Sequence, residues 1–335
     1  MKKIAVLGCG RIGVMHAANI AAHPRVSLAG VYDLAPSSAE AVASCHNVKQ
    51  FNSADEVFTD SNVDAVLVAS PTSTHVDFIE QSVNSGKPVL CEKPIDLSSE
   101  RVNELKKRIT GKDIPIMLGF VRRFDAGHAA AQKAAASGEL GELHQVIITS
   151  RDPGMAPDGY IETSGGIFRD MTIHDLDLAR FMLNEPVVAV SAHGSRKVDA
   201  ALMERCNDYD TIVVTLISAS GKQAVITNSR CAVYGYDQRV ELFGSAGMII
   251  SDNHTENRTK KYSAAATAIN PPLQHFFIER YADAFNAEID HFADVIENNT
   301  PVAVGFEDGR IALQLADACY ESISKGKTID ISQMA

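Results

Sequence analysis

Short apolar runs alternate with amphipathic stretches over roughly the first 120 residues of the chain. Strand-like runs cover residues 3–7, 26–32, 63–69, 88–91 and 115–119, and helical spacing covers residues 17–23, 36–44, 75–85 and 98–109. The run 63–69 is almost continuously apolar, which is typical of a strand buried on both faces. Strands that alternate with helices predict a parallel, doubly wound sheet with right-handed crossovers.

The pattern changes after about residue 120. An Ala-rich helix is expected over residues 125–137, and two long helices over 279–298 and 307–325. Strand-like segments with few helices between them cover residues 144–151, 187–193, 211–218, 224–231 and 239–243. Strands in succession predict an antiparallel sheet. We therefore expect an α/β chain of two domains, residues 1–120 with the parallel sheet and residues 121–335 with a mostly antiparallel one.

Glycines follow the first strand at the spacing of a dinucleotide-binding turn, within Gly8-Cys9-Gly10-Arg11-Ile12-Gly13. Gly8 permits the tight turn, Gly10 lets the backbone approach a pyrophosphate, and Gly13 lets the next helix pack close to the sheet. We expect Gly8, Gly10, Arg11, Ile12 and Gly13 to bind the cofactor in a Rossmann domain. A purely structural glycine turn is the alternative.

Asp33 ends the second strand, twenty positions after Gly13. Its carboxylate is expected to accept hydrogen bonds from the adenosine ribose of the cofactor. A carboxylate suits the free 2′-hydroxyl of NAD and repels the 2′-phosphate of NADP. Leu34, Ala35 and Pro36 offer no arginine to hold such a phosphate, so the sequence favours NAD. A helix cap before Pro36 is the structural alternative for Asp33.

Composition narrows the classes of partner. The chain has 335 residues, a formal net charge of −11 and 45% hydrophobic residues. An acidic chain without a basic tract is a poor candidate for binding nucleic acid. No run approaches the roughly 18 apolar residues of a membrane span, and no secretory signal is visible. The six cysteines form no CxxC pair, so we expect reduced thiols in a cytoplasmic protein and no metal site.

Two stretches carry candidate reacting groups. Lys93, within Glu92-Lys93-Pro94, follows a predicted parallel strand, at the end where open α/β sheets place their ligands. Its ammonium could stabilise negative charge on a substrate oxygen, and a nearby cationic nicotinamide would favour its neutral form for proton relay. The alternative is a surface lysine beside a turn proline.

The second stretch holds Asp170 and His174, four positions apart. If this segment is helical, the two side chains share one face. Histidine is the natural general base near neutral pH, and Asp170 could orient the imidazole or the substrate. The alternatives are a solvent-facing pair on a capped helix, and a metal site for which no third ligand has convincing spacing.

These motifs, in this order, resemble those of the glucose–fructose oxidoreductase and inositol dehydrogenase family over essentially the whole chain. The resemblance implies a large, open C-terminal sheet whose exposed face builds a dimer or tetramer. Shorter similarities, at residues 122–125, 150–153 and 234–237, fit the inositol-oxidising members best. The implied reaction is NAD-dependent oxidation of a secondary hydroxyl of a cyclic polyol, with myo-inositol and its 2-keto product as first candidates.

The resemblance also implies roles for individual residues. The catalytic group is Lys93, Asp170 and His174, with His174 as the proton acceptor. Residues near the cofactor are Ser70, Thr72, His75, Glu92, Lys93 and Arg122, and those that meet the polyol are Arg123, Asp152 and Tyr236. Asp152 departs from the neutral Asn expected in inositol enzymes, which leaves the choice of polyol open.

Several of these positions have alternatives. Arg151 could offset the charge of Asp152. Arg123 could pair with Asp125 on the surface, and Tyr236 could be an interior strand residue. Two other functions also remain open, namely a dehydrogenase of another sugar or sugar acid, and a non-catalytic NAD-sensing regulator.

Overall fold

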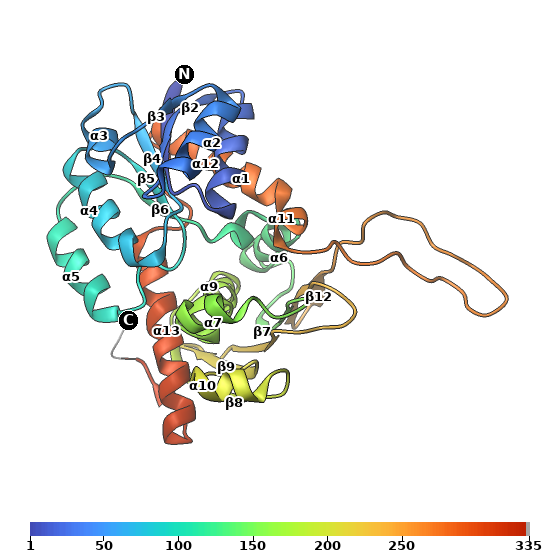
Figure 1. Ribbon diagram of the computed structural model, residues 1–335. Helices are drawn as coiled ribbons and strands as arrows, with labels where there is room; N and C mark the ends of the chain where they lie inside the picture. Colours follow the sequence, from blue (N-terminus) through green and yellow to red (C-terminus); the bar gives the residue numbers. More distant parts are fainter. Residues whose placement is uncertain (333–335) are drawn as a thin grey trace. The chain divides into compact units, whose positions relative to one another are not determined.

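The computed structural model describes residues 1–332, and the chain forms two compact units (Figure 1). The first unit comprises residues 1–121 and 283–310, and the second comprises residues 122–282 and 311–332. Within the described residues, no helix is both long enough and apolar enough to cross a membrane.

The first unit contains a six-stranded, fully parallel sheet in the order β3-β2-β1-β4-β5-β6. Its strands are β1 (Lys2–Leu7), β2 (Val26–Tyr32), β3 (Lys49–Gln50), β4 (Ala65–Val68), β5 (Val89–Cys91) and β6 (Ile116–Leu118). All four residues of β4 are buried, as its continuous apolar run predicts. This strand order is that of a dinucleotide-binding Rossmann sheet.

Helices connect these parallel strands. They are α1 (Arg11–Ala22), α2 (Pro36–His46), α3 (Ala54–Thr59), α4 (His75–Asn84) and α5 (Ser99–Ile109), with a 3₁₀ turn, η1, at Thr72–Thr74. Because all the strands run the same way, their carboxyl ends lie at one edge of the sheet. The chain leaves β1 at Gly8, β2 at Asp33, β4 at Ala69 and β5 at Glu92, so the predicted cofactor residues follow that edge.

Residues 283–310 belong to the first unit, whereas the sequence-based division at residue 120 places them in the second domain. Helix α12 (Ala282–Asn298) presents Phe285 edge-on to His16, with 5.5 Å between the ring centroids. Farther along, the Leu118 N–H donates to the Val304 carbonyl at 3.0 Å, beside an isolated bridge between Met117 and Gly305. Apolar spacing reveals that a helix has a buried face, but not which sheet that face covers.

The second unit contains a seven-stranded sheet in the order β12-β11-β7-β10-β9-β8-β13. The strands are β7 (Leu143–Arg151), β8 (Val187–Ser195), β9 (Thr211–Ser218), β10 (Gln223–Ser229), β11 (Asp237–Gly244), β12 (Gly247–Ser251) and β13 (Ile329–Asp330). Every neighbouring pair is antiparallel except β7 and β10. The predicted α/β class, with a parallel sheet and a mostly antiparallel one, is confirmed.

The helices of the second unit are α6 (Ala126–Ala136), α7 (Asp158–Thr163), α8 (Ile167–Asp170), α9 (Thr172–Leu183), α10 (Ala200–Arg205) and α11 (Phe277–Arg280), after a 3₁₀ turn, η2, at Val121–Phe124. Most of α13 (Phe306–Lys325) also belongs here. Apolar side chains of α9 and α13 pack with the strands in one core, which includes Leu178, Met182, Leu315, Val214 and Ile226. Between β12 and α11, residues 252–276 extend away as a long loop, drawn in orange in Figure 1.

Candidate functional site

The turn between β1 and α1 has the geometry that the glycine spacing predicts. Gly8 has a φ of +103°, and a Cβ there would lie 2.5 Å from the backbone of Ala69 and Ser70. A Cβ at Gly13 would lie 1.9 Å from the Gly8 carbonyl oxygen. At Gly10 nothing lies within 4 Å of such a Cβ. Two of the three glycines are therefore required by the fold itself, and the third borders open space.

The N-terminus of α1 has the general features of an anion-binding helix end. Gly10, its N-cap residue, makes no side-chain cap, and the first turn holds no acidic residue. The first N–H groups of a helix have no partner within the helix, and the helix dipole attracts anions there. Arg11 and Ile12 are the first two residues of this helix. The turn thus fits the pyrophosphate of a dinucleotide.

Both oxygens of the Asp33 carboxylate accept hydrogen bonds from the backbone. Its Oδ2 accepts from the Cys9 N–H at 2.6 Å, and its Oδ1 accepts from the Ala35 N–H at 2.8 Å. The carboxylate therefore holds the glycine turn and the start of α2 together. Each carboxylate oxygen has a second lone pair with which it can accept from a ribose hydroxyl.

The loop after β4 carries three of the residues predicted to lie near the cofactor. The Ser70 and Thr74 hydroxyls are 2.6 Å apart, and Thr72 begins the 3₁₀ turn. His75 is buried, with Nε2 2.9 Å from the Ser70 carbonyl oxygen and Nδ1 2.7 Å from the Pro94 carbonyl oxygen. Burial lowers the pKa of His75. The imidazole thus links this loop to the loop that carries Lys93.

Glu92 and Lys93 lie directly after β5 and are both half-buried. Glu92 Oε1 is 2.9 Å from Nε2 of the buried His16. Glu288 of α12 is fully buried, and burial, together with the charge of Glu92, raises the pKa of Glu288 well above its usual range. Burial and the neighbouring Glu92 carboxylate therefore both favour the protonated form of Glu288.

In the second unit, Arg122 is buried in a polar network. Its Nη1 lies 2.5 Å from Asp175 Oδ1, and its Nη2 donates to the Ser150 hydroxyl at 3.2 Å. Asn228 donates to the other oxygen of Asp175 at 2.9 Å. Burial opposes the charge on Arg122, but the nearby Asp175 carboxylate raises the pKa of Arg122 overall. Arg122 thus carries a fixed positive charge.

Asp170 and His174 lie on consecutive helices rather than on one. Asp170 ends α8 and His174 lies in the first turn of α9, with Met171 between the two helices. Asp170 Oδ1 accepts from the Tyr160 hydroxyl at 2.7 Å, and its Oδ2 accepts from Arg230 Nη1 at 3.1 Å. Asp170 is thus held from two sides, unlike a side chain that simply faces solvent.

Asp152 follows β7 and is held by its backbone. Its N–H donates to the Ser229 carbonyl at 3.0 Å, and its carbonyl accepts from the Ala232 N–H at 2.7 Å. Burial, and then the nearby charge of Asp170, raises the pKa of Asp152 to about 7. The cations that oppose this shift are Arg230 and Arg122.

The structure gives Arg151 a different role from the predicted one. Its Nη1 donates to the Tyr234 hydroxyl at 2.6 Å and to Asp237 Oδ2 at 3.2 Å. The side chains of β7 alternate between the two sides of the sheet, so adjacent residues do not share an environment. Arg230 and Arg122, rather than Arg151, therefore counter the charge of Asp152.

Arg123 pairs with Asp177 rather than with Asp125. Its Nε and Nη2 donate to the two oxygens of Asp177 at 2.8 and 2.5 Å, and its guanidinium lies 4.9 Å from the centre of the Phe181 ring. Asp125 instead caps α6. The alternative of a surface pair is thus wrong, because a partner distant in sequence forms a two-pronged, largely buried contact.

Tyr236 is buried just before β11. Its ring packs edge-on against Phe276 and Tyr281, with centroids 5.2 and 6.3 Å away. Burial raises the pKa of Tyr236 well above its usual range, so its hydroxyl stays protonated. Arg122, Asp152 and Asp175 lie close enough to act on this hydroxyl electrostatically.

Comparison with known proteins assigns the family. The model for the GFO/IDH/MocA oxidoreductase family, described as an NAD-binding Rossmann fold, matches residues 2–120, and the model for the family's C-terminal domain matches residues 128–250. The inositol 2-dehydrogenase of Rhizobium meliloti (strain 1021) is 42% identical over 98% of this chain and 99% of its own. The chain belongs to this family.

Solved structures of family members agree with the assignment. The crystal structure of a myo-inositol dehydrogenase from Corynebacterium glutamicum has a TM-score of 0.95 and 45% identity, covering 99% of both chains. A scyllo-inositol dehydrogenase from Lactobacillus casei, solved with NAD(H) and scyllo-inositol, has a TM-score of 0.91 and 28% identity, also covering 99% of both chains. The predicted family, the NAD cofactor and the dehydrogenase class are confirmed.

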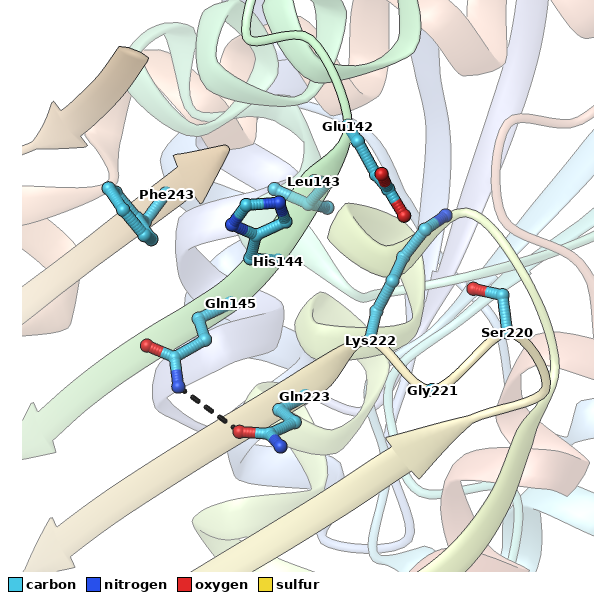
Figure 2. A pocket seen from close by; sticks show the side chains of 9 residues that line it. All are labelled: Glu142, Leu143, His144, Gln145, Ser220, Gly221, Lys222, Gln223 and Phe243. Atoms are coloured by element: carbon cyan, nitrogen blue, oxygen red, sulfur yellow. Dashed lines mark hydrogen bonds between the residues drawn. The ribbon is translucent and has the colours of Figure 1, made fainter. Parts of the chain in front are cut away.

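One cavity of about 380 Å³ lies apart from every predicted site residue (Figure 2). It is bounded by the start of β7, the turn between β9 and β10, and Phe243 of β11. Figure 2 shows Glu142 and Lys222 extending toward one another across it, and Gln145 bonded to Gln223 at 3.1 Å. Since none of the residues predicted to react or to bind a ligand lines this cavity, we do not assign the reaction to it.

Several polar residues of the second unit could not be singled out from the sequence, namely Tyr160, Asp208, Asn228 and Arg230. The sequence offers one pointer to Arg230, namely that this charged residue directly follows the strand pattern of β10. Its partners Asp170 and Asp208 lie 60 and 22 positions earlier in the sequence, so only the fold identifies them.

Proposed function

We propose that this protein oxidises one secondary hydroxyl of an inositol with NAD, with myo-inositol as first substrate and its 2-keto derivative as product. The observation that carries the proposal is the fixed carboxylate of Asp170, four positions before the half-buried His174. The substrate class is supported by full-length similarity to dehydrogenases named for inositols.

Each catalytic residue has a distinct task in this proposal. When bound, NAD supplies an acceptor for the hydride that leaves the substrate carbon. His174 takes the hydroxyl proton, directly or through Lys93, and Asp170 sets the orientation of the imidazole and of a substrate hydroxyl. Lys93 stabilises negative charge that develops on the substrate oxygen.

Other residues bind rather than react. We assign Gly8, Gly10, Arg11, Ile12, Gly13 and Asp33 to the cofactor, together with Ser70, Thr72, His75, Glu92, Lys93 and Arg122. Arg123, Asp152 and Tyr236 are assigned to the polyol. Such a set can discriminate strongly among polyols, because a substrate that lacks one hydroxyl leaves a buried polar group without its partner.

A substrate screen with NAD tests the proposal. We expect NADH to form with myo-inositol or another inositol isomer faster than with glucose, another aldose or a sugar acid. Preference for an aldose over every inositol isomer would reject the substrate class. If no NADH forms with any polyol, the chain is better described as an NAD-sensing regulator.

The variant His174→Ala tests the proton acceptor. Loss of a general base typically lowers turnover by about 10²–10⁴-fold. We expect kcat to fall within that range, while the dissociation constant for NAD stays within about threefold of the wild-type value. Turnover comparable with that of the wild type would remove His174 from the mechanism.

We further propose that two or more copies associate through the exposed face of the second sheet, as dimers or tetramers. Residues of four adjacent strands share this face by register, since Ile147 pairs with both Val225 and Glu241, and Glu241 pairs with Ile250. Phe243, Met248 and Val213 also expose apolar side chains. The six free cysteines support a reducing, cytoplasmic location.

A further inference from the structure

Helix α8 is too short to hold Asp170 in place by itself. It is a single turn, Ile167–Asp170, and a helix of that length is marginal without tertiary contacts. Its apolar side chains Ile167 and Phe168 are fully buried, and Phe168 meets Tyr320 edge-on at 4.8 Å. These contacts fix the backbone of α8, but they do not fix the direction of the Asp170 carboxylate.

The start of α8 is bonded to Asp208. Both oxygens of Asp208 accept from the Ile167 N–H, at 3.1 and 2.9 Å, and Oδ1 also accepts from the Tyr320 hydroxyl at 3.1 Å. The preceding residue, Gly166, has a φ of +86°, and a Cβ there would lie 2.0 Å from the Tyr320 hydroxyl oxygen. Asp208 therefore anchors the first turn of backbone in a tightly packed site.

The end of α8 is bonded to Arg230. Arg230 Nη1 lies 3.1 Å from Asp170 Oδ2, and Arg230 Nη2 lies 3.7 Å from Asp208 Oδ2. One guanidinium thus connects the carboxylate that anchors the start of α8 with the carboxylate at its end. Tyr160 also bonds Asp170, but its ring is half-exposed, so the buried ionic contact is the stronger constraint.

Arg230 lies behind Asp170 and cannot be the group that meets a substrate. Arg230 is 2% exposed, and its Nε and Nη2 have no hydrogen-bond partner within residues 1–332 and no accessible surface. The Asp170 side chain is 12% exposed. Only Asp170 can therefore present its carboxylate outward.

We propose that Arg230 is a positioning residue, which with Asp208 clamps α8 at both ends and so aims Asp170. This inference rests on the proposed role of Asp170 in the reaction. It predicts that loss of the clamp lowers kcat more than it weakens substrate or NAD binding, because a displacement of about 1 Å in a reacting group can cost about 10²-fold in rate.

The test compares Arg230→Met, Arg230→Lys and a matched control, Arg280→Met. Arg280 is also a buried arginine of the second unit, bonded by Nη1 to a carboxylate, Asp125, at 2.6 Å. We expect Arg230→Met to lower kcat about 100-fold, with the inositol KM and the NAD dissociation constant within about threefold. Arg230→Lys, which keeps the charge, should recover kcat to within about tenfold of the wild type.

A second readout does not require turnover. We expect hydrogen–deuterium exchange of the amides in residues 166–171 to be faster in Arg230→Met than in the wild type, and unchanged in Arg280→Met. If Arg230→Met does not fold, the same two measurements on Arg230→Lys test the clamp. Faster amide exchange in residues 166–171 together with a lower kcat supports the clamp. Wild-type values of both the exchange rate and kcat overturn it.

Two results would overturn the clamp. One is a kcat of Arg230→Met within threefold of the wild type, and the other is an equal loss in Arg280→Met. A wild-type protein that forms no NADH with any inositol instead contradicts the proposed function, and the exchange measurement then still tests the clamp.

Discussion

Among single residues, Asp152 has a charge that changes near neutral pH. Its ordinary pKa is 3.8, and burial raises it to about 7 in the folded chain. A proton bound more tightly by the folded state stabilises the fold at low pH. For Asp152 this contribution is complete below its unfolded pKa and is lost as the pH rises through about 7.

The variant Asp152→Asn should remove this pH dependence. The shift from 3.8 to about 7 corresponds to at most about 4.5 kcal/mol, taking about 1.4 kcal/mol for each pKa unit. We expect Asp152→Asn to gain stability relative to the wild type between pH 5 and pH 8, as measured by urea unfolding. If the difference in free energy of unfolding between Asp152→Asn and the wild type is the same at pH 5 and pH 8, the pKa of Asp152 is not raised in the folded chain.

Asp237 provides the control for this comparison. It is also buried, but its pKa is lowered to about 2, because its bonds to Arg239, Tyr234 and Asn253 outweigh the effect of burial. A group whose folded pKa is lowered contributes its stability above its unfolded pKa. Both measured pH values lie above that point, so Asp237→Asn should be destabilising by a similar amount at each.

At the scale of elements, the turn between β1 and α1 contains one glycine that the fold requires, Gly13, and one that only a ligand would require, Gly10. A Cβ at Gly13 would lie 1.9 Å from a backbone oxygen, whereas a Cβ at Gly10 would meet nothing within 4 Å. We expect Gly13→Ala to lower the free energy of unfolding by about 1–3 kcal/mol or more. Gly10→Ala should leave the melting temperature unchanged and weaken NAD binding about tenfold or more.

Thermal unfolding and NAD titration of both variants check this contrast. Since the two substitutions add the same methyl group, each is the control for the other. If Gly10→Ala binds NAD as the wild type does, the open space at Gly10 does not receive the pyrophosphate.

The elements themselves could largely be predicted from the sequence. The pattern over residues 26–32 and 211–218 matches β2 and β9 in full, because alternating or continuous apolar runs between turn residues leave few other solutions. The break at Met171 and the separation of α11 from α12 at Tyr281 could not be predicted, since the helical pattern continues through both.

The candidate site is predictable only where its residues form local motifs. Gly8 to Gly13, Asp33 and Glu92-Lys93 follow strand ends that the sequence marks. In contrast, Arg123 pairs with Asp177 and Asp170 pairs with Arg230, each over more than fifty positions. Such ion pairs depend on tertiary packing, and the sequence offers many arginines and aspartates that could pair instead.

At the scale of the whole molecule, helices cover one face of the second sheet, and the other face is exposed. A single charge placed on the exposed face should prevent association, because two copies related by symmetry would bring like charges together in an apolar contact. Val213 is 43% exposed on this face, and Val198, which precedes α10, is 39% exposed outside the sheet.

The variants Val213→Lys and Val198→Lys therefore make a matched pair. They change the same residue type at similar exposure, so neither should disturb the fold of the single chain. We expect sedimentation analysis to give a dimer or tetramer for the wild type and for Val198→Lys, and a single chain for Val213→Lys. A monomeric wild type would contradict association altogether, whereas an oligomeric Val213→Lys would move the contact to another surface.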